Sequence, residues 1–335
     1  MQVAEGYAPY HGNRSLTDAI QTLMQDRPAG ADGAPFPPTV QWAFKPMEDP
    51  AAAARYTWQL AHEHYENFTV VSWLVPRSMR QDFCNIYAFC RTADDLGDEV
   101  GDRARALECL ADFRRQTIDC FAGSTQTAIF TALSATIKRH DLPIKPFLDL
   151  ISAFEQDQQL TRYPDYPTLL DYCRRSANPV GHLVLYLSGY RDAERQDLAD
   201  KTCTALQLAN FWQDVRRDML DRDRIYLPAD AMVRHGVAEA DIRSGRCTAG
   251  FREMLREEVV RCRELFHQGE ALLDKVASPW REQISLFGQG GMAVLAAIER
   301  QNYDTLSSRP VVRRRTKLRL VLRALLTMGK VNLHR

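Results

Sequence analysis

Residues 86–99, IYAFCRTADDLGDE, end an apolar helical pattern with a cluster of acidic side chains. Carboxylates four positions apart lie on one face of a helix, so Asp94 and Asp98 should repel each other at a cost of roughly 0.2–0.5 kcal/mol. Either water solvates this charge or a divalent cation compensates it. At about 100° per residue, the two acids share a stripe about 60° wide with a tyrosine and an arginine, beside the apolar face, where idle charge is unfavourable. The stripe consists of Tyr87, Arg91, Asp94 and Asp98.

A second stretch, residues 207–228, has the same arrangement: QLANFWQDVRRDMLDRDRIYLP. Its amide and carboxyl side chains fall within about 80° of arc, while apolar positions such as Leu208 and Trp212 centre roughly 130° away. One such helix is commonly a solvated surface. Two such helices, each with carboxylates at positions i and i+4, favour a shared site. The polar positions are Gln207, Asn210, Asp214, Asp218 and Asp221.

If the two stripes face each other, their carboxylates line opposite walls of a cavity. Hard oxygen ligands of this kind suit Mg²⁺, which usually shares its coordination shell with water and substrate phosphates. A diphosphate is therefore the expected ligand, and clustered metal ions would stabilise it as a leaving group. Arginines fit the remaining phosphate charge, and the candidates are Arg91, Arg174, Arg175 and Arg224. Aromatic faces could stabilise the carbocation left behind, and the candidates are Phe68, Tyr87, Tyr172 and Phe211.

The overall composition is that of a soluble globular protein. Of the 335 residues 45% are hydrophobic and 26% charged, and 43 basic residues balance 43 acidic ones, so no overall field favours nucleic acid. The eight cysteines form no CxxC pair, which predicts reduced core residues rather than a zinc or redox site. No secretory signal and no apolar run of about 18 residues is visible. A cytoplasmic location is the expectation.

The pattern of apolar residues predicts an all-α fold. Apolar positions recur at spacings of three and four between prolines, and alternating strand patterns are hard to find. We expect a single helical domain over residues 51–308. Residues 1–50 hold seven of the sixteen prolines, which predicts an irregular or mobile leader. Residues 288–292, GQGGM, follow no strand, so they indicate close helix packing or a break rather than a phosphate loop.

Three stretches together resemble the squalene and phytoene synthase family. They are IYAFCRTADDLGDE, then YCRRSANPVGHLV at residues 172–184, and LQLANFWQDVRRDMLDRDRIYLP at residues 206–228. The resemblance covers about residues 55–305. It implies the helical isoprenoid synthase type I fold with a central cavity, in which two aspartate motifs bind Mg²⁺ and a prenyl diphosphate.

The resemblance also implies roles for individual residues, carried over by their position in the motifs. The implied metal ligands or their supports are Asp94, Asp98, Asn210, Asp214 and Asp218. Tyr87 and Arg91 are implied to be catalytic, because they contact the diphosphate or shape the cavity. The implied substrate-binding residues are Phe68, Tyr172, Gln207, Asn210, Arg224 and Tyr226. Gly97 departs from the pattern, and since glycine costs about 1 kcal/mol within a helix, we expect the helix to end or loosen near Asp98.

Two short motifs resemble those of one branch of this family, the hydroxysqualene synthases of bacterial hopanoid pathways. They are Asn67-Phe68 within HYENFTVVSWLVP, and NFWQDV at residues 210–215. Such an enzyme would ionise presqualene diphosphate, open the cyclopropyl cation and let water capture it, without NADPH. Two alternatives stay open. One is head-to-head condensation of two prenyl diphosphates to presqualene diphosphate, squalene or phytoene; the other is a non-catalytic assembly factor, which would be expected to lose the acidic ligands.

The C-terminal segment, residues 309–335, contains nine Lys or Arg and no Asp or Glu, with leucines and valines between them. Such a segment could lie on an anionic membrane, or it could be a final helix with a solvated basic face. No nucleic-acid-binding module accompanies the charge. The expected partners are therefore presqualene diphosphate, an anionic membrane surface contacted peripherally, and other enzymes of the squalene pathway.

Overall fold

The computed structural model describes residues 44–64 and 75–332, and within these ranges every regular element is a helix. The all-α prediction is confirmed. Most of the expected leader, residues 1–50, lies outside the described residues, and the first described helix begins at Pro50. The elements up to residue 187 are α3 (Pro50–His64), η1 (Arg77–Met79), α5 (Arg80–Asp98), α6 (Arg103–Phe121), α7 (Ala128–His140), α8 (Lys145–Asp157), α9 (Tyr166–Ser176) and α10 (Asn178–Leu187).

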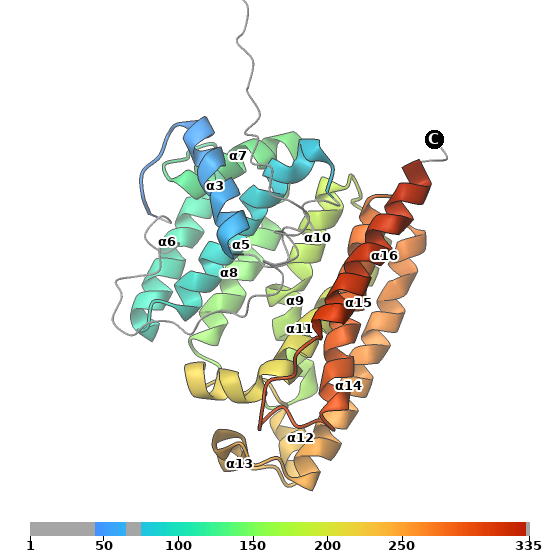
Figure 1. Ribbon diagram of the computed structural model, residues 1–335. Helices are drawn as coiled ribbons and strands as arrows, with labels where there is room; N and C mark the ends of the chain where they lie inside the picture. The colour runs from blue at the N-terminus through green and yellow to red at the C-terminus, as the bar shows by residue number, and fades with distance from the viewer. Residues whose placement is uncertain (1–43, 65–74, 333–335) are drawn as a thin grey trace, which may run out of the picture.

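The remaining elements surround one long helix, α11, which carries the second acidic stripe. It packs against α9 and α10 on the side of the first helices, and against α14 and α15 on the other. Figure 1 shows α16, in dark red, lying along α15 in this second group. The elements are α11 (Ala193–Arg222), α12 (Ala229–Arg234), α13 (Glu239–Ser244), α14 (Ala249–Gly269), η2 (Glu270–Asp274), α15 (Trp280–Arg300) and α16 (Arg314–Asn332).

Local sequence explains where several helices begin and end. The side chains of Asp102, Asp165 and Asp192 each accept a hydrogen bond from the backbone N–H three residues later, which caps α6, α9 and α11. The end of α11 is a sharp turn. Asp223 adopts a left-handed conformation with φ 52° and turns the chain sharply after Arg222.

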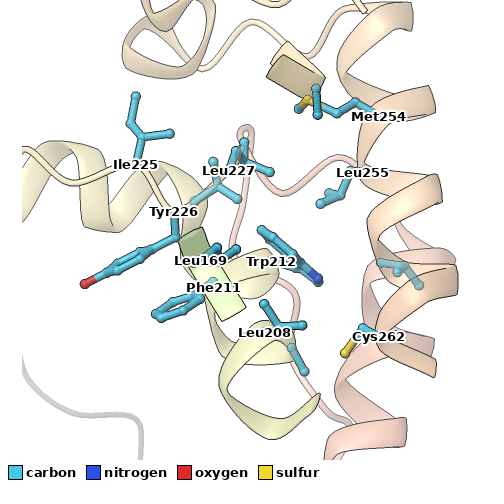
Figure 2. Packing of buried hydrophobic residues seen from close by; sticks show 14 of the residues in the cluster. Leu169, Leu208, Phe211, Trp212, Ile225, Tyr226, Leu227, Met254, Leu255 and Cys262 are labelled. Atoms are coloured by element: carbon cyan, nitrogen blue, oxygen red, sulfur yellow. The ribbon is translucent and has the colours of Figure 1, made fainter. Parts of the chain in front are cut away.

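Two buried clusters hold the helices together. One lies among the four helices α5, α6, α7 and α8. Its centre is formed by the rings of Phe89, Phe113, Phe130 and Phe147, whose centroids lie 4.9–6.1 Å apart. The other surrounds Trp212 of α11, which is fully buried among residues of α14 and of the chain after α11 (Figure 2). The core face of α11 thus lies beside Trp212, as the helical pattern predicts.

Glycines allow close approach where helices touch α11 and its neighbours. A Cβ at Gly181 would lie 2.6 Å from the Cys203 sulfur, and one at Gly291 would lie 2.2 Å from the Phe266 ring. α15 runs unbroken through GQGGM, where Gly291 allows close helix packing while a Cβ at Gly288 or Gly290 would meet nothing within 4 Å. All eight cysteines are free thiols, as expected from their spacing.

Candidate active site

The acidic ends of α5 and α11 come together in the structure. Arg222, the last residue of α11, lies 2.9 Å from Asp98 and 3.8 Å from Glu99 at the end of α5. Arg224 follows the left-handed turn and lies 2.6 Å from the other oxygen of Asp98. Both helix ends also carry a partial negative charge from their backbone carbonyls. The two helix ends therefore gather carboxylates and arginines into one charged cluster.

The first acidic stripe has one arginine of its own. Arg91 pairs with Asp95, which is buried, and lies 3.8 Å from Asp94. Asp94 keeps 43% of its side chain exposed, whereas Asp98 keeps 14%. Tyr87 is half-buried one turn earlier, against a small cluster containing Ala61. The structure thus leaves Asp94 as the most accessible acid of this stripe.

Gly97 has a packing role beside these acids. A Cβ at this position would lie 3.3 Å from the Cβ of Phe154, and the Gln158 amide donates to the Gly97 carbonyl at 2.8 Å. The helix ends one residue later, at Asp98, which agrees with the expectation from the sequence. Glycine therefore lets α5 lie close to α8 where the acidic cluster is built.

An arginine that lies 95 positions later in the chain binds an acid of the second stripe. Asp214 is buried, and the Arg309 guanidinium donates to both of its oxygens, at 2.5 and 2.9 Å. Asp218 lies one turn closer to Arg222. Asn210 is exposed and Gln207 half-buried one and two turns earlier. Every polar position of this stripe thus lies on the same helix, and its acids lie toward the end of the helix that meets α5.

Two of these carboxyls hold protons unusually tightly. Although 43% of its side chain is exposed, the chain packed around the Asp94 carboxyl keeps water away from it and Asp98 repels it, and together they raise the pKa of Asp94. Burial, with repulsion from Asp214, raises the pKa of Asp218 to about 7. Arg222 opposes both shifts, but it does not abolish them. Desolvation and mutual repulsion thus disfavour full ionisation of these acids, and a divalent cation bound between them would compensate their charge.

A third carboxyl, Asp157 at the end of α8, was not singled out in the sequence. Its Oδ2 atom accepts hydrogen bonds from Tyr172 at 2.5 Å and Tyr226 at 3.3 Å, and lies 3.7 Å from Arg224. Tyr226 stacks on Phe211 with ring centroids 3.7 Å apart, a contact visible in Figure 2. Burial raises the pKa of Asp157 to about 7. The predicted Tyr172, Arg224 and Tyr226 therefore form one network.

Some expected residues lie elsewhere. The arginines Arg174 and Arg175, considered for the diphosphate, both pair with Asp171 on their own helix, and Arg175 also contacts Ser152 on α8. The arginine that pairs with the acids at the end of α5 is Arg222. It lies four positions after Asp218 and so continues the stripe of α11. Phe68 lies outside the described residues.

Within residues 44–64 and 75–332, no three or more His, Cys, Asp or Glu side chains form a self-sufficient metal site. The carboxylates instead come in pairs on two helices. Mg²⁺ is commonly bound by one or two carboxylates together with water and substrate phosphates. The donor set therefore fits Mg²⁺ ions that are shared with a diphosphate, with the acids of α5 and α11 on opposite sides.

Comparison with protein families gives a match over most of the chain. Residues 61–316 match the Squalene/phytoene synthase family. None of the described helices is long and apolar enough to cross a membrane.

Individual proteins show the same relationship. The chain is 30% identical to phytoene synthase 3 of Zea mays over 80% of its own length and 64% of the relative's. It is 30% identical to the hydroxysqualene synthase of Sinorhizobium fredii, over 63% of this chain and 71% of that one. A crystal structure of squalene synthase HpnC from Alicyclobacillus acidocaldarius is 44% identical, with a TM-score of 0.72 over 76% of this chain and 95% of that chain.

Proposed function

The chain belongs to the squalene/phytoene synthase family, and from this membership we propose that it is a hydroxysqualene synthase that depends on Mg²⁺. The observation that carries the proposal is the meeting of the α5 and α11 acids around Arg222 and Arg224. The choice of branch is supported by the likeness to the Sinorhizobium fredii hydroxysqualene synthase, and the 44% identity to the squalene synthase HpnC of Alicyclobacillus acidocaldarius supports a C30 product.

The proposed site has a diphosphate-binding end. The residues that would hold Mg²⁺ are Asp94, Asp98, Asn210, Asp214 and Asp218. Bound there, Mg²⁺ would neutralise the diphosphate oxygens and improve the leaving group. Arg91, Arg222 and Arg224 add positive charge beside the same acids, and a guanidinium fits a phosphate group through paired hydrogen bonds. Their positions favour cleavage of the carbon–oxygen bond at this end, with the electron pair leaving on diphosphate.

The other end of the proposed site is aromatic. Ionisation of presqualene diphosphate leaves a cyclopropylcarbinyl cation, which rearranges by opening its ring. The faces of Tyr172, Phe211 and Tyr226 would stabilise this cation through their ring electrons. Water then forms the new carbon–oxygen bond and loses one proton, so the product is a C30 alcohol. Water takes the place of hydride in this reaction, and no NADPH is needed.

A second function shares every proposed metal ligand. The 30% identity to phytoene synthase 3 of Zea mays favours head-to-head condensation of two prenyl diphosphates. A non-catalytic assembly role is disfavoured, because the acids of both stripes are present and lie together.

Product analysis separates these functions. Purified protein with Mg²⁺ and presqualene diphosphate, without NADPH, should release diphosphate and form a C30 alcohol. Consumption of farnesyl or geranylgeranyl diphosphate, with presqualene diphosphate left intact, would support phytoene or presqualene diphosphate synthesis instead. If the protein converts none of these three substrates, the result would support the non-catalytic assembly role.

We also propose a peripheral membrane contact for residues 309–335, in a protein that otherwise resides in the cytoplasm. In the structure α16 packs along α15, and Val311 and Leu322 are exposed by 54% and 44%. Exposed apolar side chains among basic ones suit an anionic lipid surface, from which a long hydrocarbon substrate could enter.

A further inference from the structure

Asp157 is a buried carboxyl to which the proposed reaction assigns no role. Only 4% of the residue is exposed, and every contact gathers on one of its oxygens. Tyr172 and Tyr226 both donate to Oδ2, and Arg224 lies 3.7 Å from the same atom. The other oxygen, Oδ1, is buried without a hydrogen-bond partner among the described residues. Because an unpaired buried oxygen is costly, such an arrangement requires an explanation.

The contacts of Asp157 join the two ends of the proposed site. On one side Arg224 donates to Asp98 at 2.6 Å, within the acidic cluster. On the other side Tyr226 stacks on Phe211 with an interplanar angle of 7°, and its ring centroid lies 5.7 Å from that of Tyr172. Asp157 is thus the one group in this network that contacts both the arginine of the acidic end and the hydroxyls of the aromatic end.

We propose that Asp157 is a positioning residue that fixes the spacing between the diphosphate-binding end and the aromatic cluster. The proposal rests on the proposed function, because spacing matters when a cation forms as diphosphate departs. A misplacement of about 1 Å can cost roughly a hundredfold in rate. The hydroxyl bonds to Asp157 hold the two tyrosine rings, so the ring faces stay where the cation develops.

A carboxyl that only stabilises the fold would behave differently. Asp82 of α5 offers a matched control, because it is 1% exposed and accepts hydrogen bonds from Thr136 at 2.9 Å and Arg139 at 3.0 Å. Asp82 lies in a separate cluster with His140 and touches none of the proposed site residues. Asp82→Asn should lower stability while leaving the kcat of the folded enzyme and its product ratio unchanged.

The test is a double-mutant cycle on Asp157 and Tyr172, assayed with whichever prenyl diphosphate the wild-type enzyme consumes. Asp157→Asn keeps the shape but weakens the bonds to its donors, so we expect kcat to fall at least about tenfold with KM within about twofold. The share of minor products should rise, because the cation is less well confined. Tyr172→Phe should have a similar effect, and the double variant should lose little more than the worse single variant.

Additive losses in the cycle, or a wild-type kcat and product ratio in Asp157→Asn, would overturn the proposal. If Asp157→Asn does not fold, Tyr226→Phe removes one bond to the same oxygen and should still shift the product ratio. An unchanged ratio in Tyr226→Phe would then count against the role of Asp157. A wild-type enzyme that consumes no prenyl diphosphate is a different failure, which contradicts the proposed function and this inference with it.

Discussion

Arg309 holds the carboxylate of Asp214 through two hydrogen bonds, one to each oxygen. The neighbouring Gln213 strengthens this contact, because its amide donates to the Pro310 carbonyl at 2.6 Å and accepts from Arg309 at 3.2 Å. The segment between α15 and α16 is thereby fixed to α11 at a proposed metal ligand. A guanidinium and a divalent cation would therefore compete for Asp214.

We expect Arg309→Gln to raise the affinity of the substrate-free protein for Mg²⁺ by about fivefold, since a half-exposed ion pair contributes about 1 kcal/mol. Isothermal titration with Mg²⁺ measures this directly. Arg217→Gln is the matched control, because Arg217 pairs at 3.3 Å with Asp221, an exposed acid of the same helix that is not a proposed metal ligand. Equal affinities in the two variants would indicate a general charge effect and would contradict competition at Asp214.

Asp94→Asn and Asp214→Asn should each reduce turnover by about a hundredfold or more, because each removes a charge that would stabilise the departing diphosphate. Diphosphate release gives the rate, and thermal unfolding shows whether the fold is kept. Asp221→Asn, an exposed position on α11, should leave turnover unchanged. Full activity in either of the first two variants would refute the assigned roles.

The stability of the protein should depend on pH through Asp157. Its pKa is raised to about 7 by burial, against about 3.9 in an unfolded chain. The folded state therefore binds this proton more tightly, and the associated stability is present below about pH 4 and is lost as pH rises towards 7. Urea unfolding of wild type and Asp157→Asn measures the difference, because Asp94 and Asp218 contribute equally to both. The wild-type advantage should fall by up to a few kcal/mol across this range. If the free energies of unfolding of wild type and Asp157→Asn change in parallel with pH, the predicted contribution of Asp157 is contradicted.

Truncation before Arg314 tests the membrane contact while keeping Arg309 and Pro310 on α11. The truncated chain should bind vesicles of anionic phospholipid much more weakly than the full chain, because it loses the basic residues of α16. Co-sedimentation measures the bound fraction, and vesicles of zwitterionic lipid serve as the control. Equal binding of both chains to anionic vesicles would reject the contact.

Periodicity found the two acidic stripes because it depends only on helix geometry. Positions 94 and 98, and positions 214 and 218, share a helix face whatever the rest of the fold does. The family resemblance added that these helices lie together. Arg222 could have been found in the same way, as the next i+4 position after Asp218. Among the described residues, the adjacent pair Arg174 and Arg175 forms no ion pair with the acids of the two stripes. Those arginines are paired with Asp171, three and four positions earlier on their own helix.

Asp157 and Arg309 could not be predicted by such reasoning. Asp157 contacts Arg224, which is 67 positions further along the chain, and Arg309 contacts Asp214 across 95 positions. No local spacing joins such pairs, because they meet only once α8, the turn after α11 and the segment following α15 have taken their places in the folded chain. The sequence therefore indicates the charged faces, and tertiary packing decides which cation each acid receives.

The most direct test of the proposed reaction is the source of the product oxygen. Turnover of presqualene diphosphate with Mg²⁺ in ¹⁸O-labelled water, followed by mass spectrometry, should give a C30 alcohol carrying one labelled oxygen. An unlabelled alcohol, or the absence of any alcohol while other prenyl diphosphates are consumed, would contradict capture of the cation by water.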